Sequence, residues 1–256
     1  MNKSLLAAGI SLLIPLITPL SSKAQLLPPD VLVNGASQSE LSASWWQWGL
    51  SYPDGQNPIQ DETGAYSHLG DQGSVFFLAG SFGNSVIRSV TVSSNQTLFF
   101  PLINTLSIIT KNDETETGIR QDASDSIGIV NKLFLKLNGN DLPLPSSTNS
   151  LEDYRQFSPL FDLTIPDNSI LRAFLVGGTY SSVSDGFWAA LQPLKTGNYI
   201  LNFGGETVGT GPYDGLPFNQ DITYNITVKP VPEPALISGL ITLGLLGATS
   251  LKRKKS

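Results

Sequence analysis

The chain of 256 residues has no cysteine and only one histidine, and charged residues make up 14% of it. Without cysteine the protein can form neither disulfides nor thiolate metal sites, and it has no cysteine nucleophile. The lone histidine, His68, excludes zinc sites built on histidine pairs and leaves at most one imidazole for acid–base catalysis. The fold must therefore rest on its core alone, which a chain of this length can bury.

Basic residues are scarce between positions 25 and 230, where nine Lys and Arg stand against twenty Asp and Glu. The resulting net charge of −11 is more acidic than the −6 of the whole chain. A surface of this sign repels nucleic acid and anionic lipid. We therefore expect no nucleic-acid partner and a better match to neutral glycans or divalent cations.

The first 24 residues have the layout of a secretory signal peptide. A short basic start with Lys3 precedes an apolar stretch over 5–20, and the small-residue site Ser22-Lys23-Ala24 follows it. This pattern predicts export, with cleavage by signal peptidase before Gln25. An uncleaved anchor is the alternative, which two prolines within the apolar stretch disfavour.

The last 26 residues combine three features in a fixed order. A proline-rich motif comes first, an apolar run over 235–251 follows, and a basic cluster ends the segment. The motif and the cluster are Val231, Pro232, Glu233 and Pro234, and Lys252, Arg253, Lys254 and Lys255. As a helix the run is about 25 Å long, close to the minimum for crossing a bilayer. Because the cations favour a cytoplasmic C-terminus, we expect a single membrane-spanning helix at 235–251.

This order of motif, apolar run and basic tail resembles the PEP-CTERM sorting signal of Gram-negative bacteria and cyanobacteria. The resemblance implies that an exosortase recognises the chain in the inner membrane and removes the tail, in cells that make extracellular polysaccharide. Together with the signal peptide, it predicts a protein at the cell surface, in the outer envelope or outside the cell. It does not predict the activity of the exported part.

Residues 25–230 form that exported part, and one domain is the simplest count for this length. A composition rich in Gly, Pro, Ser, Thr and Asn favours β structure. Apolar and polar residues alternate over 222–228, as a half-buried strand requires, and again over 133–137 before the hairpin signal Asn138-Gly139. Further strands are expected at 75–79, 86–92, 98–103, 161–165, 171–176 and 199–203. The predicted fold is mainly β, an antiparallel β-sandwich of about eight strands.

One or two short helices are expected among the strands. The first has a single apolar stripe that ends before Pro53 and consists of Leu41, Trp45, Trp48 and Tyr52. The second covers 114–131, which lacks proline and follows Asp113, a suitable N-cap. Two glycines lower its helix propensity.

The tryptophans at 45, 46 and 48 are the most conspicuous feature of the exported part. Aromatic rings can stack on sugar rings, so a glycan platform is one hypothesis. The helical stripe predicts instead that Trp45 and Trp48 pack in the core. Trp46 lies off the stripe, and we assign it as the candidate ligand contact.

The segment 54–71 gathers acidic groups around the lone histidine, namely Asp54, Asp61, Glu62, Tyr66, His68 and Asp71. Such groups could bind a metal or act as acid and base. Their spacing matches neither a His-Glu-x-x-His motif nor a calcium loop, and no Gly-x-Ser-x-Gly elbow accompanies them. We therefore predict a polar surface loop and assign no metal, cofactor or catalytic residue.

Arg88 shares the parity of the apolar residues in its expected strand, which directs it toward the core. A buried guanidinium needs a carboxylate or several carbonyls. Asp185, in a Gly- and Ser-rich stretch, is the candidate partner for a buried ion pair. The alternatives are that Arg88 extends to solvent at an edge strand and that Asp185 belongs to a turn.

Several blocks of the exported part resemble an exported bacterial family of unknown activity. They are Ser44-Trp45-Trp46-Gln47-Trp48, residues 73–80, 98–105, 183–188 and 221–228. Relatives in that family often have cysteines near Ser67 and Val90, where this chain has none. The resemblance implies one exported domain and transfers no catalytic residue.

Three functions remain open from the sequence. The first is a non-enzymatic surface or extracellular protein that associates with extracellular polysaccharide or other envelope material. The second is a hydrolase or lyase that acts on that polysaccharide through carboxylates such as Asp61, Glu62 and Asp71. The third is a structural or adhesive surface protein without a glycan ligand, for which a large apolar patch would be evidence.

Overall fold

The computed structural model describes residues 24–231. The signal peptide up to Lys23 and the sorting segment after Val231 lie outside the described residues. The two cleavage events and the membrane span at 235–251 therefore stay predictions. Within 24–231, no helix is both long enough and apolar enough to span a membrane.

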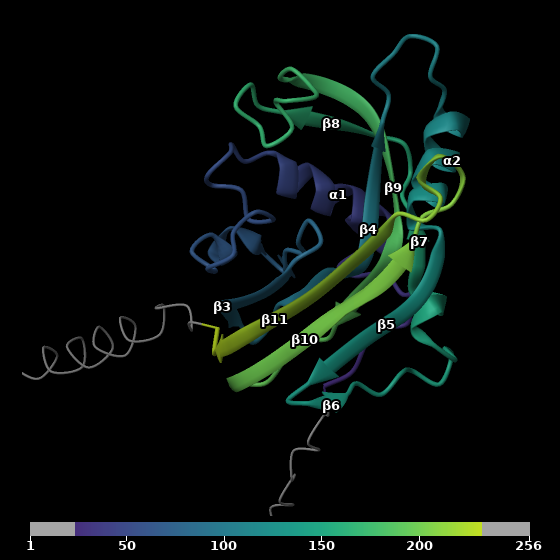
Figure 1. Ribbon diagram of the computed structural model, residues 1–256. Helices are drawn as coiled ribbons and strands as arrows, with labels where there is room; N and C mark the ends of the chain where they lie inside the picture. Colours follow the sequence, from purple (N-terminus) through teal and green to yellow (C-terminus); the bar gives the residue numbers. More distant parts are fainter. Residues whose placement is uncertain (1–23, 232–256) are drawn as a thin grey trace, which may run out of the picture.

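Two β-sheets and two α-helices form the described fold, which confirms the mainly β class and is consistent with a sandwich (Figure 1). The first sheet has the order β1 (Asp71–Gln72), β2 (Val75–Phe77), β4 (Thr97–Ile108), β9 (Gly178–Leu191) and β7 (Arg155–Phe157), and β8 (Phe161–Ile165) also pairs with β9. The second sheet has the order β3 (Ser85–Ser93), β11 (Pro217–Lys229), β10 (Gly197–Val208), β5 (Ile129–Leu137) and β6 (Asn140–Asp141).

The strand predictions need two corrections. The pairs β2–β4 and β3–β11 are parallel, so the expectation of a purely antiparallel sandwich was wrong there. Parallel neighbours need a crossover rather than a hairpin, and strand patterns do not reveal crossovers. Residues 171–176 form no strand, whereas the 14-residue β9 was missed because buried serines, Asp185 and Gly186 interrupt its apolar pattern.

The second sheet follows the alternating pattern that the sequence predicts. In β11 the residues from Ile222 to Val228 alternate between buried and more exposed positions, and β3 does the same. The β5–β6 hairpin turns at Asn138 and Gly139 with φ of 52° and 79°. Positive φ at both positions is what a type I′ turn requires, so the predicted hairpin is confirmed.

The first sheet is covered on both faces. One face packs against the second sheet, with Phe100 and Phe203 in a ring contact of 4.5 Å between centroids. The other face packs against α1 (Gln38–Leu50), where Trp45 contacts Trp188 at 5.4 Å. Strands β4 and β9 therefore lie in the middle of three layers, which explains their continuous apolar runs.

The helices begin and end at residues with specific caps. In α1 a capping box joins Ser37 and Glu40, and the helix ends at Leu50, shortly before Pro53. Helix α2 covers Glu116–Ile127 with Thr115, not Asp113, as its N-cap. It ends at Gly128, where φ is 58° and a Cβ would lie 2.2 Å from the Val208 carbonyl oxygen. Short 3₁₀ turns occur at η1 (Ser67–Gly70), η2 (Leu151–Tyr154) and η3 (Gly211–Tyr213).

A bulge interrupts β4 at Pro101, in the middle of the first sheet. The pairing with β9 shifts register between Pro101 and Ile103. A proline inside a sheet requires such an irregularity, because it has no N–H to donate. The buried amide of Gln220 donates to the carbonyls of Pro101 and Leu102 at 3.1 and 2.6 Å, so the bulge is fixed by the second sheet.

Both ends of the described chain lie at one end of the sandwich (Figure 1). The Gln192 N–H, just after β9, donates to the Gln25 carbonyl, and Val228 of β11 pairs with Gly197. The opposite end of the same strands is marked by the pair Thr207 and Phe218. At about 3.3 Å per residue, the two ends of β10 are separated by roughly 35 Å.

Candidate functional site

The predicted ion pair between Arg88 and Asp185 is not present. Arg88 is 1% exposed, so its predicted inward direction is correct, but its partners are oxygen atoms of neutral groups. The guanidinium donates to the carbonyls of Asp61 (2.6 Å), Ala79 (2.8 Å), Gly80 (2.9 Å) and Ile59 (3.2 Å) and to the Tyr224 hydroxyl (3.2 Å). Five short hydrogen bonds can satisfy the fixed geometry of a guanidinium without a carboxylate.

The acidic segment 54–71 is a folded loop that Arg88 ties to the sheet. The Asp61 carboxylate accepts hydrogen bonds from the N–H groups of Thr63, Gly64 and Tyr66, at 2.8 to 3.0 Å, and from the Thr63 hydroxyl at 2.7 Å. Burial opposes ionisation of Asp61, but these donors outweigh it and lower its pKa below the ordinary value. Asp61 therefore holds a turn.

Four other groups of this loop have polar neighbours within the fold. Asp54 pairs with Arg172, Glu62 accepts from the Asn84 amide, and Asp71 accepts from the Gln96 amide. His68 Nδ1 lies 3.1 Å from the Ala65 carbonyl oxygen. Among residues 24–231, no group of three or more His, Cys, Asp or Glu is placed to hold a metal ion.

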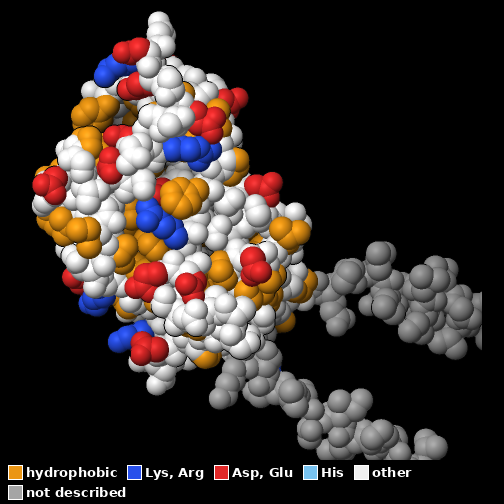
Figure 2. Space-filling model, turned by 90° about the vertical axis from the view of Figure 1, so that its right-hand side faces the viewer, with side chains coloured by type: hydrophobic (Ala, Val, Ile, Leu, Met, Phe, Trp, Pro, Cys, Tyr) orange, Lys and Arg blue, Asp and Glu red, His pale blue; other side chains and the backbone are white. Residues whose placement is uncertain are grey.

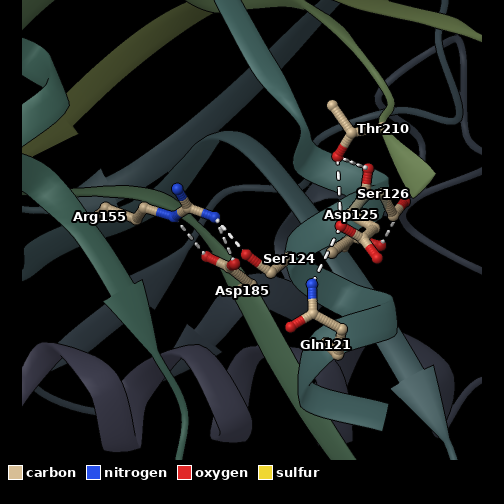
Figure 3. Close-up of polar contacts among 8 residues, drawn as sticks. Gln121, Ser124, Asp125, Ser126, Arg155, Asp185 and Thr210 are labelled. Atoms are coloured by element: carbon tan, nitrogen blue, oxygen red, sulfur yellow. Dashed lines mark hydrogen bonds and ion pairs between the residues drawn. The ribbon is translucent and has the colours of Figure 1, made fainter. Parts of the chain in front are cut away.

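Asp185 is buried beside a different arginine, Arg155 of β7 (Figure 3). Nε and Nη2 of Arg155 reach the two carboxylate oxygens at 3.0 and 2.7 Å, and Nη2 also donates to the Ser124 hydroxyl of α2. The side chain of Asp185 is 1% exposed and that of Arg155 is 30% exposed. Hydrogen bonding to Asp185 raises the pKa of Arg155, so the guanidinium stays charged.

Helix α2 is attached to the sheets by further polar contacts. Its Ser126 hydroxyl accepts from Thr105 of β4 at 3.2 Å, and Asp125 accepts from Gln121 and Thr210 (Figure 3). One turn earlier, Asp122 accepts from Tyr213 at 2.9 Å and from Ser107 at 3.0 Å. These contacts place α2 across the end of the sandwich.

An apolar cleft of about 340 Å³ opens at this end. Side chains from α1, β4, α2, β10 and β11 line it, and eleven of the sixteen lining residues are apolar. Trp46, the predicted ligand contact, is one of them, but only 8% of it is exposed. Its Nε1–H donates to the Ser184 hydroxyl at 3.0 Å, so the indole is a fixed wall of the cleft. Trp45 and Trp48 are buried in the core, as predicted.

A second, shallow groove of about 430 Å³ lies on the outer face of the second sheet. Its lining contains no charged residue and consists of Asn138, Asn198, Tyr199, Ile200, Asn225, Ile226 and Thr227. Register brings them together, because Ile200 pairs with Asn225 and Asn198 pairs with Thr227. Ile200 is 51% exposed between the polar side chains.

Two side-chain amides of the groove are oriented by hydrogen bonds within the fold and still have donors that a ligand could use. The side-chain oxygen Oδ1 of Asn138 accepts from the Ile200 N–H at 2.9 Å. The side-chain oxygen Oδ1 of Asn198 accepts from the Thr227 hydroxyl at 3.1 Å. Each of these two amides keeps an NH₂ group for a ligand. The groove therefore offers oriented donors and acceptors beside an apolar surface. No single sequence motif indicates it, because its residues come from two strands and a distant turn.

Other surface regions are mixed in character. On the face that carries α2, acidic and basic side chains are interspersed with apolar ones (Figure 2). One exposed apolar ring is that of Phe157 in β7, which is 50% exposed and has the Arg155 guanidinium 5.0 Å from its centroid. This face therefore does not present the continuous apolar patch that an adhesive surface would favour.

Comparison with known proteins assigns no family. No family model matches the chain, and no curated protein does. A chain from the "Structure of PbICP-C in complex with falcipain-2" aligns with 61% of this chain and 100% of its own length, at 10% identity and a TM-score of 0.21. A likeness this weak carries neither a fold family nor a function to this protein.

Proposed function

We propose that this protein is exported, sorted by an exosortase, and binds extracellular polysaccharide at the cell surface or outside the cell without cleaving it. The observation that carries the proposal is the uncharged groove on the outer sheet, where asparagine and threonine side chains surround an exposed isoleucine. Signal peptidase and exosortase are the processing partners, and the inner membrane holds the chain until the tail is removed.

The chemistry of the groove suits a neutral glycan. Sugar hydroxyls are both donors and acceptors, and amide and hydroxyl side chains match both roles. Ile200 can contact the C–H face of a sugar ring, which adds apolar burial to the hydrogen bonds. Binding there desolvates no charge. The net charge of −11 over residues 25–230 disfavours a strongly anionic polymer.

The position of the groove fits the proposed sorting route. Asn225 and Thr227 lie near the end of β11, and the Val231-Pro232-Glu233-Pro234 motif follows directly. A glycan in the groove would therefore lie at the end of the domain that faces the anchor. Alternating prolines make the motif a stiff spacer between the two.

The carboxylates favour binding over hydrolysis. A glycosidase needs two carboxyl groups facing each other across an open cleft, about 5 to 9.5 Å apart. Asp61 is bound by four donors, and Glu62 and Asp71 each accept a hydrogen bond from a side-chain amide of the fold. These contacts support a structural role for the three groups.

Light scattering of the producing organism's purified polysaccharide, with and without the protein, tests the proposal. We expect the mass of the particles to rise and to saturate as protein is added. A mass that falls with time would mean cleavage and would contradict the proposal in favour of the enzyme. A constant mass would exclude both glycan functions for that polymer.

Two variants locate the contact. Asn198→Ala with Asn225→Ala removes two groove amides and should weaken binding at least tenfold, because two net hydrogen bonds of about 1 kcal/mol each are lost. Asn219→Ala is the matched control, since Asn219 is an exposed asparagine of β11 with the parity of Asn225 but lies outside the groove. Equal binding by all three proteins would place the glycan elsewhere.

A further inference from the structure

The apolar cleft runs along an edge of β4 that has no neighbouring strand within residues 24–231. β2 pairs with β4 only at residues 97–99, whereas β9 pairs with it as far as Ile108. The cleft is lined by Ile103, Asn104, Thr105, Leu106 and Ile108 of β4, beyond the reach of β2. Trp46 and Leu171 lie on its walls.

The register shows which backbone groups face this edge. The Ile109 N–H donates to the Ser181 carbonyl, so residues 103, 105, 107 and 109 exchange hydrogen bonds with β9. Asn104, Leu106 and Ile108 then direct their N–H and C=O groups away from β9, toward the free edge. No backbone or side-chain partner among residues 24–231 reaches these groups. Three donors and three acceptors in strand geometry are therefore open.

This edge lacks the features that normally keep strand edges from pairing. Lysine, proline and bulges protect exposed edges in monomeric proteins. Here Pro101 and the bulge protect only the start of the segment, and residues 104–108 have the sequence Asn-Thr-Leu-Ser-Ile, without charge or proline. An unprotected edge inside an apolar cleft indicates a partner rather than solvent.

The side chains around the edge provide apolar walls. Several polar side chains there are already bonded within the fold, since Trp46 donates to Ser184, Thr105 to Ser126, and Ser81 to the Asn84 carbonyl. The side-chain amide nitrogen of Asn104 is buried and has no hydrogen-bond partner among residues 24–231, so it adds one donor for an occupant of the cleft. Main-chain hydrogen bonds with apolar pockets for alternate side chains are the requirements of strand addition. They differ from those of a sugar, which needs several free polar side chains around each ring.

We propose that the edge of β4 from Asn104 to Ile108 binds an extended apolar peptide segment of a partner protein, which adds to the first sheet as a strand. The segment has small apolar side chains at alternate positions and lies between β4, Trp46 and Leu171. This site is separate from the groove on the second sheet, so either can fail without the other.

The test uses the full chain and a blocked pentapeptide of alternating valine and threonine. We expect saturable binding by calorimetry and slower hydrogen exchange at the amides of Asn104, Leu106 and Ile108. The same peptide with N-methylated valines keeps its side chains but loses backbone donors, and it should bind at least tenfold more weakly. Equal binding of the two peptides, or no binding of either, would overturn the proposal.

Two substitutions at one position separate backbone from side chain. Leu106→Pro removes an N–H that faces the edge and should abolish peptide binding, whereas Leu106→Ala keeps the N–H and should retain most of it. If Leu106→Pro does not fold, the methylated peptide still decides the question. Amides that are protected in the free protein, together with a dimeric mass in solution, would show that a second copy occupies the edge and would also overturn the proposal.

Discussion

Arg88 is buried and Arg155 is partly exposed, and their charges are compensated in different ways. Arg88 is enclosed by four main-chain carbonyls and a tyrosine hydroxyl, whereas Arg155 forms a two-bond ion pair with Asp185. The first arrangement binds a loop to a sheet, and the second joins two strands to α2 through Ser124. The comparison shows that an arginine can order main-chain carbonyls as well as pair with a buried anion.

Replacing Arg88 should destabilise the fold more than replacing Arg155. We expect Arg88→Met to lower the free energy of unfolding by about 4 kcal/mol or more, because several buried carbonyls lose their donor at once. Urea unfolding followed by tryptophan fluorescence measures the loss. Arg88→Lys should recover only part of it, since an ammonium has three donors and no planar fork. A loss below 1 kcal/mol for Arg88→Met would mean that water replaces the guanidinium.

The second largest effect is expected at the ion pair. Arg155→Met should lower the free energy of unfolding by about 3 kcal/mol, because Asp185 is left buried without its partner. A double-mutant cycle in the same unfolding assay sharpens the comparison. Arg155 and Asp185 should show a coupling energy of roughly 1 to 3 kcal/mol, whereas Arg88 and Asp185 should be additive within about 0.5 kcal/mol. Strong coupling of Arg88 with Asp185 would contradict the separation of the two sites.

The smallest expected effect is at Asp61, whose turn Arg88 holds through the Asp61 carbonyl. Asp61→Asn should cost about 1 to 2 kcal/mol at neutral pH, since an amide nitrogen meets N–H donors that the carboxylate accepts. The folded-state pKa of Asp61 is lowered, so its stabilisation is present above about pH 4 and is lost as pH falls through that folded-state pKa.

Unfolding curves of the wild type and Asp61→Asn, measured from pH 7 down to pH 2, check this dependence. The difference between them should shrink below about pH 4. Asp162→Asn, at an exposed position of β8, is the matched control and should show no such change. A difference that is constant over the whole range would mean that the Asp61 charge contributes nothing.

Local sequence patterns predicted the elements whose signal is a fixed spacing of apolar residues or a short turn motif. The alternation in β3 and β11, the stripe of α1 and the Asn138-Gly139 hairpin are of this kind. β9 was not predicted, because a strand buried on both faces has no alternation and here contains polar residues with distant partners. The parallel pairs escaped prediction because crossovers leave no periodic signal.

The candidate sites were less predictable than the fold. Parity directed Arg88 inward correctly, but the choice of Asp185 as its partner was wrong, since parity says nothing about which strands are neighbours. Trp46 was singled out for lying off the helical stripe, and it does line a cleft. Nothing in the sequence marks the β4 edge or the amide groove, because both arise from pairings between distant segments.

The sequence by itself determined the mainly β class, the absence of covalent crosslinks, the acidic charge and the two terminal segments from which we propose export and sorting. These properties depend on composition and on short-range order along the chain. Only the tertiary structure decided which carbonyls surround Arg88, which arginine meets Asp185, and where an uncharged groove and an open strand edge lie. Those depend on sheet register, and register is set by contacts between residues far apart in the chain.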